Sequence, residues 1–143
     1  MTDQATNFER LSRTMHLLQQ TLAPFVEREL KRTGAGWWTN YVLPSVAPLT
    51  REKLPAMPKR GVNGQLEVVP VEDLLALIAK NFASTFRGRL KDPARSYAEE
   101  LRGHRNLWAH KGAGDIDRAS AERAMDTAAL LLDDVDPSAA RAA

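Results

Sequence analysis

The sequence predicts an all-α domain, a bundle of four principal helices with a long loop between the first and the second. Two observations support this prediction. In four separate segments the apolar residues recur at steps of three and four, which is the period of a helix with one buried face. Proline, glycine and aspartate mark the ends of these segments, and only the short stretch 65–69 alternates in the manner of a strand.

The first helix is expected from about Thr6 to Lys31. Its apolar stripe consists of Phe8, Leu11, Met15, Leu18, Leu22 and Phe25. Pro24 falls inside this pattern, where it removes a backbone donor and crowds the preceding turn, so we expect a kink or a break near Gln20–Pro24. His16 lies beside the stripe, and we expect a structural role for it.

A long connection follows the first helix. The segment Trp37–Val46 is predicted to form a short helix, in which Trp37 and Trp38 are either core or interface residues or a platform for stacked bases. From Ala47 to Val69 the chain carries three prolines and two glycines and is predicted to form a loop, with a brief strand or hairpin over Gln65–Val69. Because a loop of about twenty residues is unusual inside a small domain, we expect it to be functional or ordered by a partner.

Two further helices precede a glycine-rich segment. The first of them begins at Pro70, has acidic residues in its first turn, and is expected to run to about Arg87. The second has Asp92 as its expected N-cap and Pro93 as its first residue, and it continues through about His110. The glycines that follow His110 then stop it.

The last helix is expected to be capped by Asp115 or Asp117 and to end before Asp136-Pro137. Its apolar and small side chains supply one more buried face. We therefore expect a single domain over residues 1–136, and a disordered tail or the start of a linker over residues 137–143.

Composition excludes several classes of protein. The chain has no cysteine, which rules out disulfides, thiolate nucleophiles and cysteine-ligated metal sites. No secretion signal and no apolar run of about 18 residues is present, so a cytoplasmic location without membrane contact is expected. The chain has no His-x-x-x-His pair and no complete glycine-rich nucleotide loop, which argues against a helical zinc site and against a nucleotide cofactor.

Chemistry-bearing residues are concentrated at the end of the third predicted helix. The segment is Arg102-Gly103-His104-Arg105-Asn106-Leu107-Trp108-Ala109-His110. Arg105 and His110 are five positions apart, about 140° around an ideal helix, so they border one cleft only if the helix edge faces it or the last turn loosens. Leu101 and Trp108 would anchor the opposite face in the core. The alternative is a purely structural role, in which Arg105 forms an ion pair with a nearby glutamate and His110 is a favourable cation at a helix C-terminus.

The charge distribution points to the same segment. The net charge is only +2, but the segment from Arg87 to Lys111 contains seven basic residues and only three acidic ones. A locally basic stretch of this kind favours a polyanionic partner, although a solvated helix face would also account for it.

This segment resembles the signature of the HEPN superfamily, an arginine followed by a polar residue and then by a histidine at the end of a helix. Together with Ala94–Leu101 and the helix around Asn81-Phe82, it looks like the Swt-type HEPN branch, over roughly Val71 to Asp134. The resemblance implies a helical bundle that dimerises about a two-fold axis. It further implies a composite cleft that cuts RNA without a metal or other cofactor, leaving 2′,3′-cyclic phosphate and 5′-hydroxyl ends.

The resemblance also assigns roles to residues. Arg105, Asn106 and His110 would be the catalytic set, with His110 as acid or base, Arg105 holding phosphate, and Asn106 orienting the histidine or the phosphate. Basic residues nearby would bind the substrate; they are Arg89, Lys91, Arg102, His104 and Lys111. The alternative is a non-catalytic RNA-binding or dimerisation module, the N-terminal domain of a larger ATPase- or helicase-type antiviral defence protein.

Overall fold

The structure is a computed structural model that describes residues 6–59, 61–109 and 116–136; of residues 105–109 it describes the backbone. Its described part is helical and contains no strand, which confirms the all-α prediction. The four longest helices are the four predicted ones, α1 (Asn7–Lys31), α4 (Val71–Lys80), α5 (Pro93–Ala109) and α6 (Arg118–Val135). No helix among the described residues is long and apolar enough to cross a membrane.

Helix α1 begins as its sequence predicts. The Thr6 side chain accepts a hydrogen bond from the Glu9 backbone N–H at 3.0 Å, and the Glu9 carboxylate accepts one from the Thr6 N–H, which completes a capping box. Of the predicted kink or break near Gln20–Pro24, the break is wrong, because α1 continues through Pro24 to Lys31, and the kink stays a prediction. Burial of the neighbouring Ala23, Phe25 and Val26 offsets the cost of about 3 kcal/mol that an internal proline carries.

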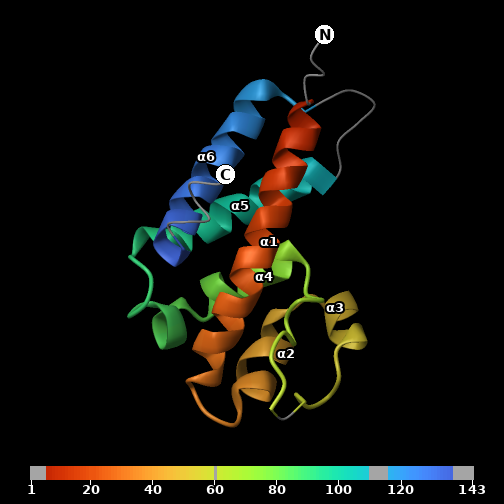
Figure 1. Ribbon diagram of the computed structural model, residues 1–143, viewed down its shortest axis with the longest axis vertical. Coiled ribbons are helices and arrows are strands. Elements are labelled where there is room, and N and C mark those ends of the chain that lie inside the picture. The colour runs from red at the N-terminus through yellow and green to blue at the C-terminus, as the bar shows by residue number, and fades with distance from the viewer. Residues whose placement is uncertain (1–5, 60, 110–115, 137–143) are drawn as a thin grey trace.

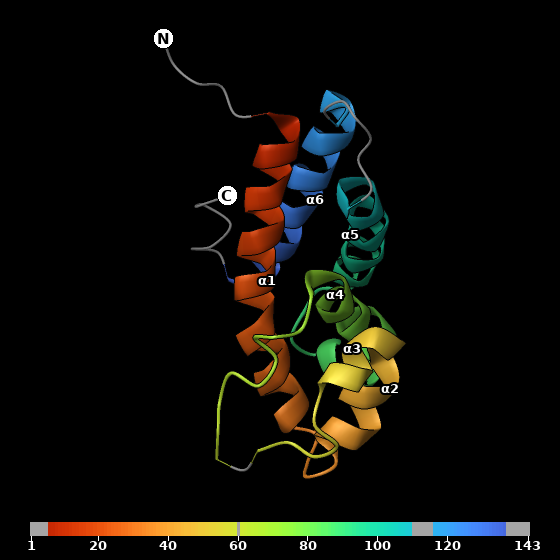
Figure 2. The ribbon, with the colours of Figure 1, turned by 90° about the vertical axis from the view of Figure 1, so that its right-hand side faces the viewer.

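Helix α4 lies at the centre of the bundle. Nearly all of its side chains are buried, including the acidic Asp73, so it needs partners on every side. It packs against α1 and α5, and α6 closes the bundle by packing against α1 and α5 (Figures 1 and 2). The helices α5 and α6 both carry fully buried alanines, which suit close helix packing; they are Ala94, Ala98, Ala121, Ala124 and Ala128.

The predicted helix from Pro70 to Arg87 is interrupted. Helix α4 ends at Lys80, Asn81 leaves the helical conformation with φ −114° and ψ 20°, and a π-helical turn, η2 (Phe82–Phe86), follows. The Asn81 side chain donates to the Leu77 carbonyl at 2.9 Å and to Ser45 Oγ at 3.0 Å. These side-chain hydrogen bonds compete with the regular backbone hydrogen bonds of a helix. The spacing of the apolar residues alone could not indicate this interruption.

The connection between α1 and α4 is more structured than predicted. It contains a π-helical turn, η1 (Trp38–Val42), and two short helices, α2 (Leu43–Ser45) and α3 (Pro48–Lys53). The predicted strand over Gln65–Val69 is wrong, since these residues form turns. Both Trp37 and Trp38 are buried, and Trp38 Nε1 donates to the Pro55 carbonyl at 2.9 Å, so the pair belongs to the core and offers no open stacking platform.

Side chains of the long helices order this connection. Asp73 of α4 accepts hydrogen bonds from the Ala47 N–H and the Thr50 hydroxyl at the start of α3. The buried Glu27 of α1 accepts from the backbone N–H groups of Gly64 at 3.0 Å and Leu66 at 2.9 Å. The order of this segment therefore comes from the chain itself, through contacts between residues far apart in sequence.

Candidate functional site

The end of α5 carries the candidate catalytic residues. Ala94, Ala98 and Leu101 are spaced by four and three positions and are fully buried, so they fix the face of α5 that meets the bundle. Arg105 and Asn106 lie in the last turns of this helix, which ends at Ala109. His110, Lys111 and the glycine-rich stop lie outside the described residues, as do the side chains of residues 105–109. The shared cleft of Arg105 and His110 therefore stays a prediction.

A carboxylate one turn before this segment joins α5 to α6. Glu100 accepts two hydrogen bonds from the Arg123 guanidinium, from Nη2 at 2.7 Å and from Nε at 3.2 Å, and a further one from the Thr127 hydroxyl. Hydrogen bonding to Arg123, and then to Thr127, lowers the pKa of Glu100 from 4.5 to about 2. This cluster fixes α5 against α6 close to the motif.

His104 faces the same cluster. Its Nε2 lies 3.6 Å from Glu100 Oε2, one helical turn away, and only 19% of its side chain is exposed. His104 was predicted to bind substrate, and the structure places it beside a carboxylate at the α5–α6 contact, immediately before Arg105. The spacing of four between Glu100 and His104 could have suggested this pair from the sequence, but the contribution of Arg123 from α6 could not.

The predicted substrate-binding residues do not all lie at one end of α5. Arg102 is exposed on α5 near the motif. Arg89 and Lys91 precede the helix, so about 18 Å of helix axis, from Pro93 onward, separates them from Arg105. Arg89 Nε lies 3.0 Å from the buried Glu29 carboxylate of α1, and the Lys91 backbone N–H donates to Asp134 at 2.8 Å. Within one chain the structure does not bring these two residues to the motif.

The chain returns to the bundle directly after the motif segment. Ile116 is buried, and its carbonyl accepts a hydrogen bond from the Asn7 side chain at 3.1 Å, at the start of α1. Asp117 then caps α6 by accepting from the Ser120 N–H at 3.0 Å, as one of the two predicted caps. Both ends of the segment that contains His110 are therefore attached to long helices.

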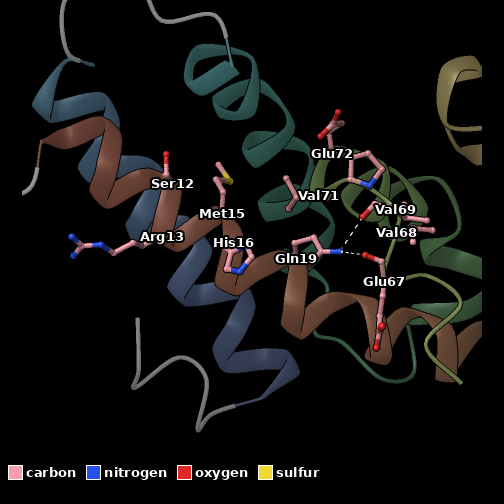
Figure 3. A pocket seen from close by; sticks show the side chains of 11 residues that line it. Ser12, Arg13, Met15, His16, Gln19, Glu67, Val68, Val69, Val71 and Glu72 are labelled. Carbon is pink, nitrogen blue, oxygen red and sulfur yellow. Dashed lines mark hydrogen bonds between the residues drawn. The ribbon is translucent and has the colours of Figure 1, made fainter.

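A groove that sequence reasoning missed lies between α1 and the segment Glu67–Glu72. We call it the α1 groove; its volume is about 720 Å³ (Figure 3). Met15, Val69 and Val71 give it an apolar base, and the exposed His16 lies on its α1 side. His16, for which a structural role was expected, thus lines an open groove. The sequence could not indicate this groove, because the wall opposite α1 comes from a segment about fifty residues further along the chain.

The far wall of the α1 groove is held by one side chain. Gln19 Nε2 donates to the Glu67 carbonyl at 2.9 Å and to the Val69 carbonyl at 3.1 Å, as the dashed lines of Figure 3 show. The last turns of α5 lie next to the first half of α1, above the start of α4 (Figures 1 and 2).

Comparison with known proteins gives one match. A family model described as Swt1-like HEPN matches residues 13–136, a range that includes most of α1, all of α4, α5 and α6, and the Arg105–His110 segment. No curated protein matches the chain, and no solved structure does.

Proposed function

The chain belongs to the Swt1-like HEPN family, and from this premise we propose that it is an RNA-directed domain that cuts RNA as a metal-independent endoribonuclease. The observation that supports the proposal is the position of the arginine, asparagine and histidine of the motif. Arg105 and Asn106 lie in the last turns of α5, and His110 follows within the matched range.

The proposed reaction is an internal transfer at phosphorus. A ribose 2′-oxygen attacks the neighbouring phosphorus and the 5′-oxygen leaves, which gives a 2′,3′-cyclic phosphate and a 5′-hydroxyl end. His110 takes the proton from the 2′-hydroxyl or delivers one to the leaving oxygen. Arg105 donates to phosphate oxygens as negative charge builds on them, and Asn106 orients the histidine or the phosphate.

The proposal includes a homodimer. One chain supplies one Arg105 and one His110, and a two-fold axis near the end of α5 would bring two sets to one cleft. The basic residues nearest to that cleft would be Arg102, His104 and Lys111. Arg89 and Lys91, at the other end of α5, would contact RNA only outside the nucleotides that react.

A cleavage assay tests this function. Mixed single-stranded RNAs are incubated with the protein in the presence of EDTA, and the fragments are resolved on a denaturing gel. We expect cleavage by the wild-type chain and none by His110→Ala or Arg105→Ala. The matched control is Arg32→Ala, which removes an exposed arginine at the C-terminal end of α1 and should cut normally.

The outcomes separate the two functions that the sequence suggests. RNA binding without cleavage by any variant would replace the nuclease with the non-catalytic RNA-binding module of a larger parent protein. Equal cleavage by the wild-type chain and His110→Ala would mean that the activity does not come from this motif. Parallel purification of all variants makes a contaminating nuclease visible, because it would cut with each of them.

A further inference from the structure

We propose that the α1 groove binds an unpaired base of the RNA strand that is cut at the end of α5. The inference rests on the proposed function and adds a substrate subsite to it. It is carried by the shape of the α1 groove, by the residue types on its two sides, and by its position beside the motif helix.

The base of the groove suits a flat, largely apolar group. Met15, Val69 and Val71 are buried side chains whose surfaces line it, and a volume of about 720 Å³ falls in the range of about 300–1,000 Å³ typical of small-molecule sites. His16 lies at the centre of the view in Figure 3, beside Gln19 and below Met15. An imidazole next to an apolar surface is a stacking partner for an unpaired base.

The charges on the two sides orient the strand. Arg13 stands three positions before His16 on α1, at the open edge of the groove, while Glu67 and Glu72 line the opposite wall (Figure 3). Carboxylates repel phosphate and a guanidinium attracts it. The backbone of the strand would therefore run along the α1 edge, with its base turned inward.

The groove is also formed in advance. Gln19 fixes the backbone of Glu67 and Val69 through two hydrogen bonds, and Val69 N–H donates to the Leu66 carbonyl at 3.0 Å. A wall that is already ordered loses little conformational freedom when a ligand binds. Because the last turns of α5 lie next to the first half of α1, a base in the groove and a phosphate at the motif can belong to one short strand (Figure 2).

Binding to a fluorescein-labelled single-stranded RNA of mixed sequence, measured by anisotropy, tests the inference. All proteins carry His110→Ala, so that the RNA is not cut during the measurement. His16→Ala should weaken binding about fivefold or more, since stacking of one base on an aromatic ring contributes a factor of this size or larger. His16→Phe keeps a flat ring and should bind within about twofold of the parent. His16 is exposed, so neither change threatens the fold.

Further variants and a duplex RNA distinguish binding of a base from non-specific electrostatic binding of the phosphate backbone. Arg13→Ala should lower the slope of log affinity against log salt by about one, as loss of one phosphate contact does. Arg32→Ala removes the same charge about 29 Å away from Arg13 along the axis of α1 and should leave the slope unchanged. A fully paired duplex of the same sequence has no free base, so His16→Ala should not change its affinity.

The failures of the two proposals look different. If the wild-type chain cuts RNA and His16→Ala binds single strands as tightly as its parent, the subsite is wrong and the nuclease stands. If His16→Phe is as weak as His16→Ala, the imidazole acts otherwise than by stacking, and the inference is overturned. If the parent binds no RNA and the wild-type chain cuts none, both proposals fail.

Discussion

Replacing Glu100 tests the contact that fixes α5 to α6. Glu100→Gln keeps the shape of the side chain and removes its charge, so the bonds from Arg123 and Thr127 lose an ionised acceptor. The pKa of Glu100 is lowered from 4.5 to about 2, which at 1.36 kcal/mol per unit corresponds to about 3 kcal/mol. The Arg123 side chain is 68% exposed, however, and solvent screening reduces this contribution to about 1–2 kcal/mol.

The pH dependence follows from the sign of the shift. A carboxyl whose pKa is lower in the folded chain stabilises the fold above its ordinary value of 4.5, and this stabilisation is lost as pH falls through 4.5 toward 2. At pH 7 the Tm of Glu100→Gln should be about 3–6 °C lower than that of the wild-type chain. The difference should shrink as the pH is lowered and nearly vanish close to pH 2.

Thermal unfolding followed by circular dichroism between pH 7 and 2.5 measures this difference. Glu122→Gln is the matched control, because Glu122 also pairs with an arginine, Arg118 at 2.8 Å, in a pair that lies on the exposed surface of one helix. It should change the Tm far less. If the Tm difference for Glu100→Gln stays constant from pH 7 to 2.5, the loss comes from packing, and the ionic role assigned to Glu100 is refuted.

Three other predictions concern the connection, the charge and the assembly. Glu27→Ala leaves two backbone N–H groups without their carboxylate and should lower the free energy of unfolding in urea by about 2–4 kcal/mol. Glu52→Ala, at an exposed position, is the control and should have little effect; equal losses for the two variants would refute the anchoring role of Glu27. Replacing Arg89 and Lys91 together with alanine should lower RNA affinity evenly across sequences and flatten its salt dependence, without moving the cleavage positions. Sedimentation well above micromolar concentration should show a dimer, and a monomer there would count against a composite cleft.

The helices could be predicted because their signals are local. The apolar stripe of α1, its start near Thr6 and the cap at Asp117 depend on residues within one or two turns, and the structure has them where the sequence indicates. The helix start at Pro93 is correct for the same reason.

The connection could not be predicted because its partners are distant in sequence. The apolar pattern does not indicate whether Asp73 and Glu27 are buried or exposed. Their burial is explained by the backbone N–H groups that they accept from, which belong to the start of α3 and to residues 64–66. The same reason explains Asn81, whose contact with Ser45 crosses the fold.

The candidate site at the end of α5 comes from the sequence and stays a prediction, whereas the α1 groove is found only in the structure. The end of α5 was identified by the density of charged and imidazole groups and by resemblance, which needs no knowledge of packing. The α1 groove was missed because His16 is one histidine next to an apolar stripe, and the opposite wall around Val69 is brought to it only by folding. Arg89 and Lys91 were grouped with the motif because they are near in sequence, although the length of α5 separates them from it.

The most direct test of the proposed nuclease is the chemistry of the ends that it leaves. RNA cut in the presence of EDTA is analysed for 2′,3′-cyclic phosphate at the 3′ side of each break, and for a 5′-hydroxyl that a kinase can label without prior dephosphorylation. Attack by the 2′-oxygen predicts both ends with the wild-type chain, and no fragments with His110→Ala. Fragments with 5′-phosphate ends, or the same fragments from His110→Ala, would contradict the mechanism assigned to the end of α5.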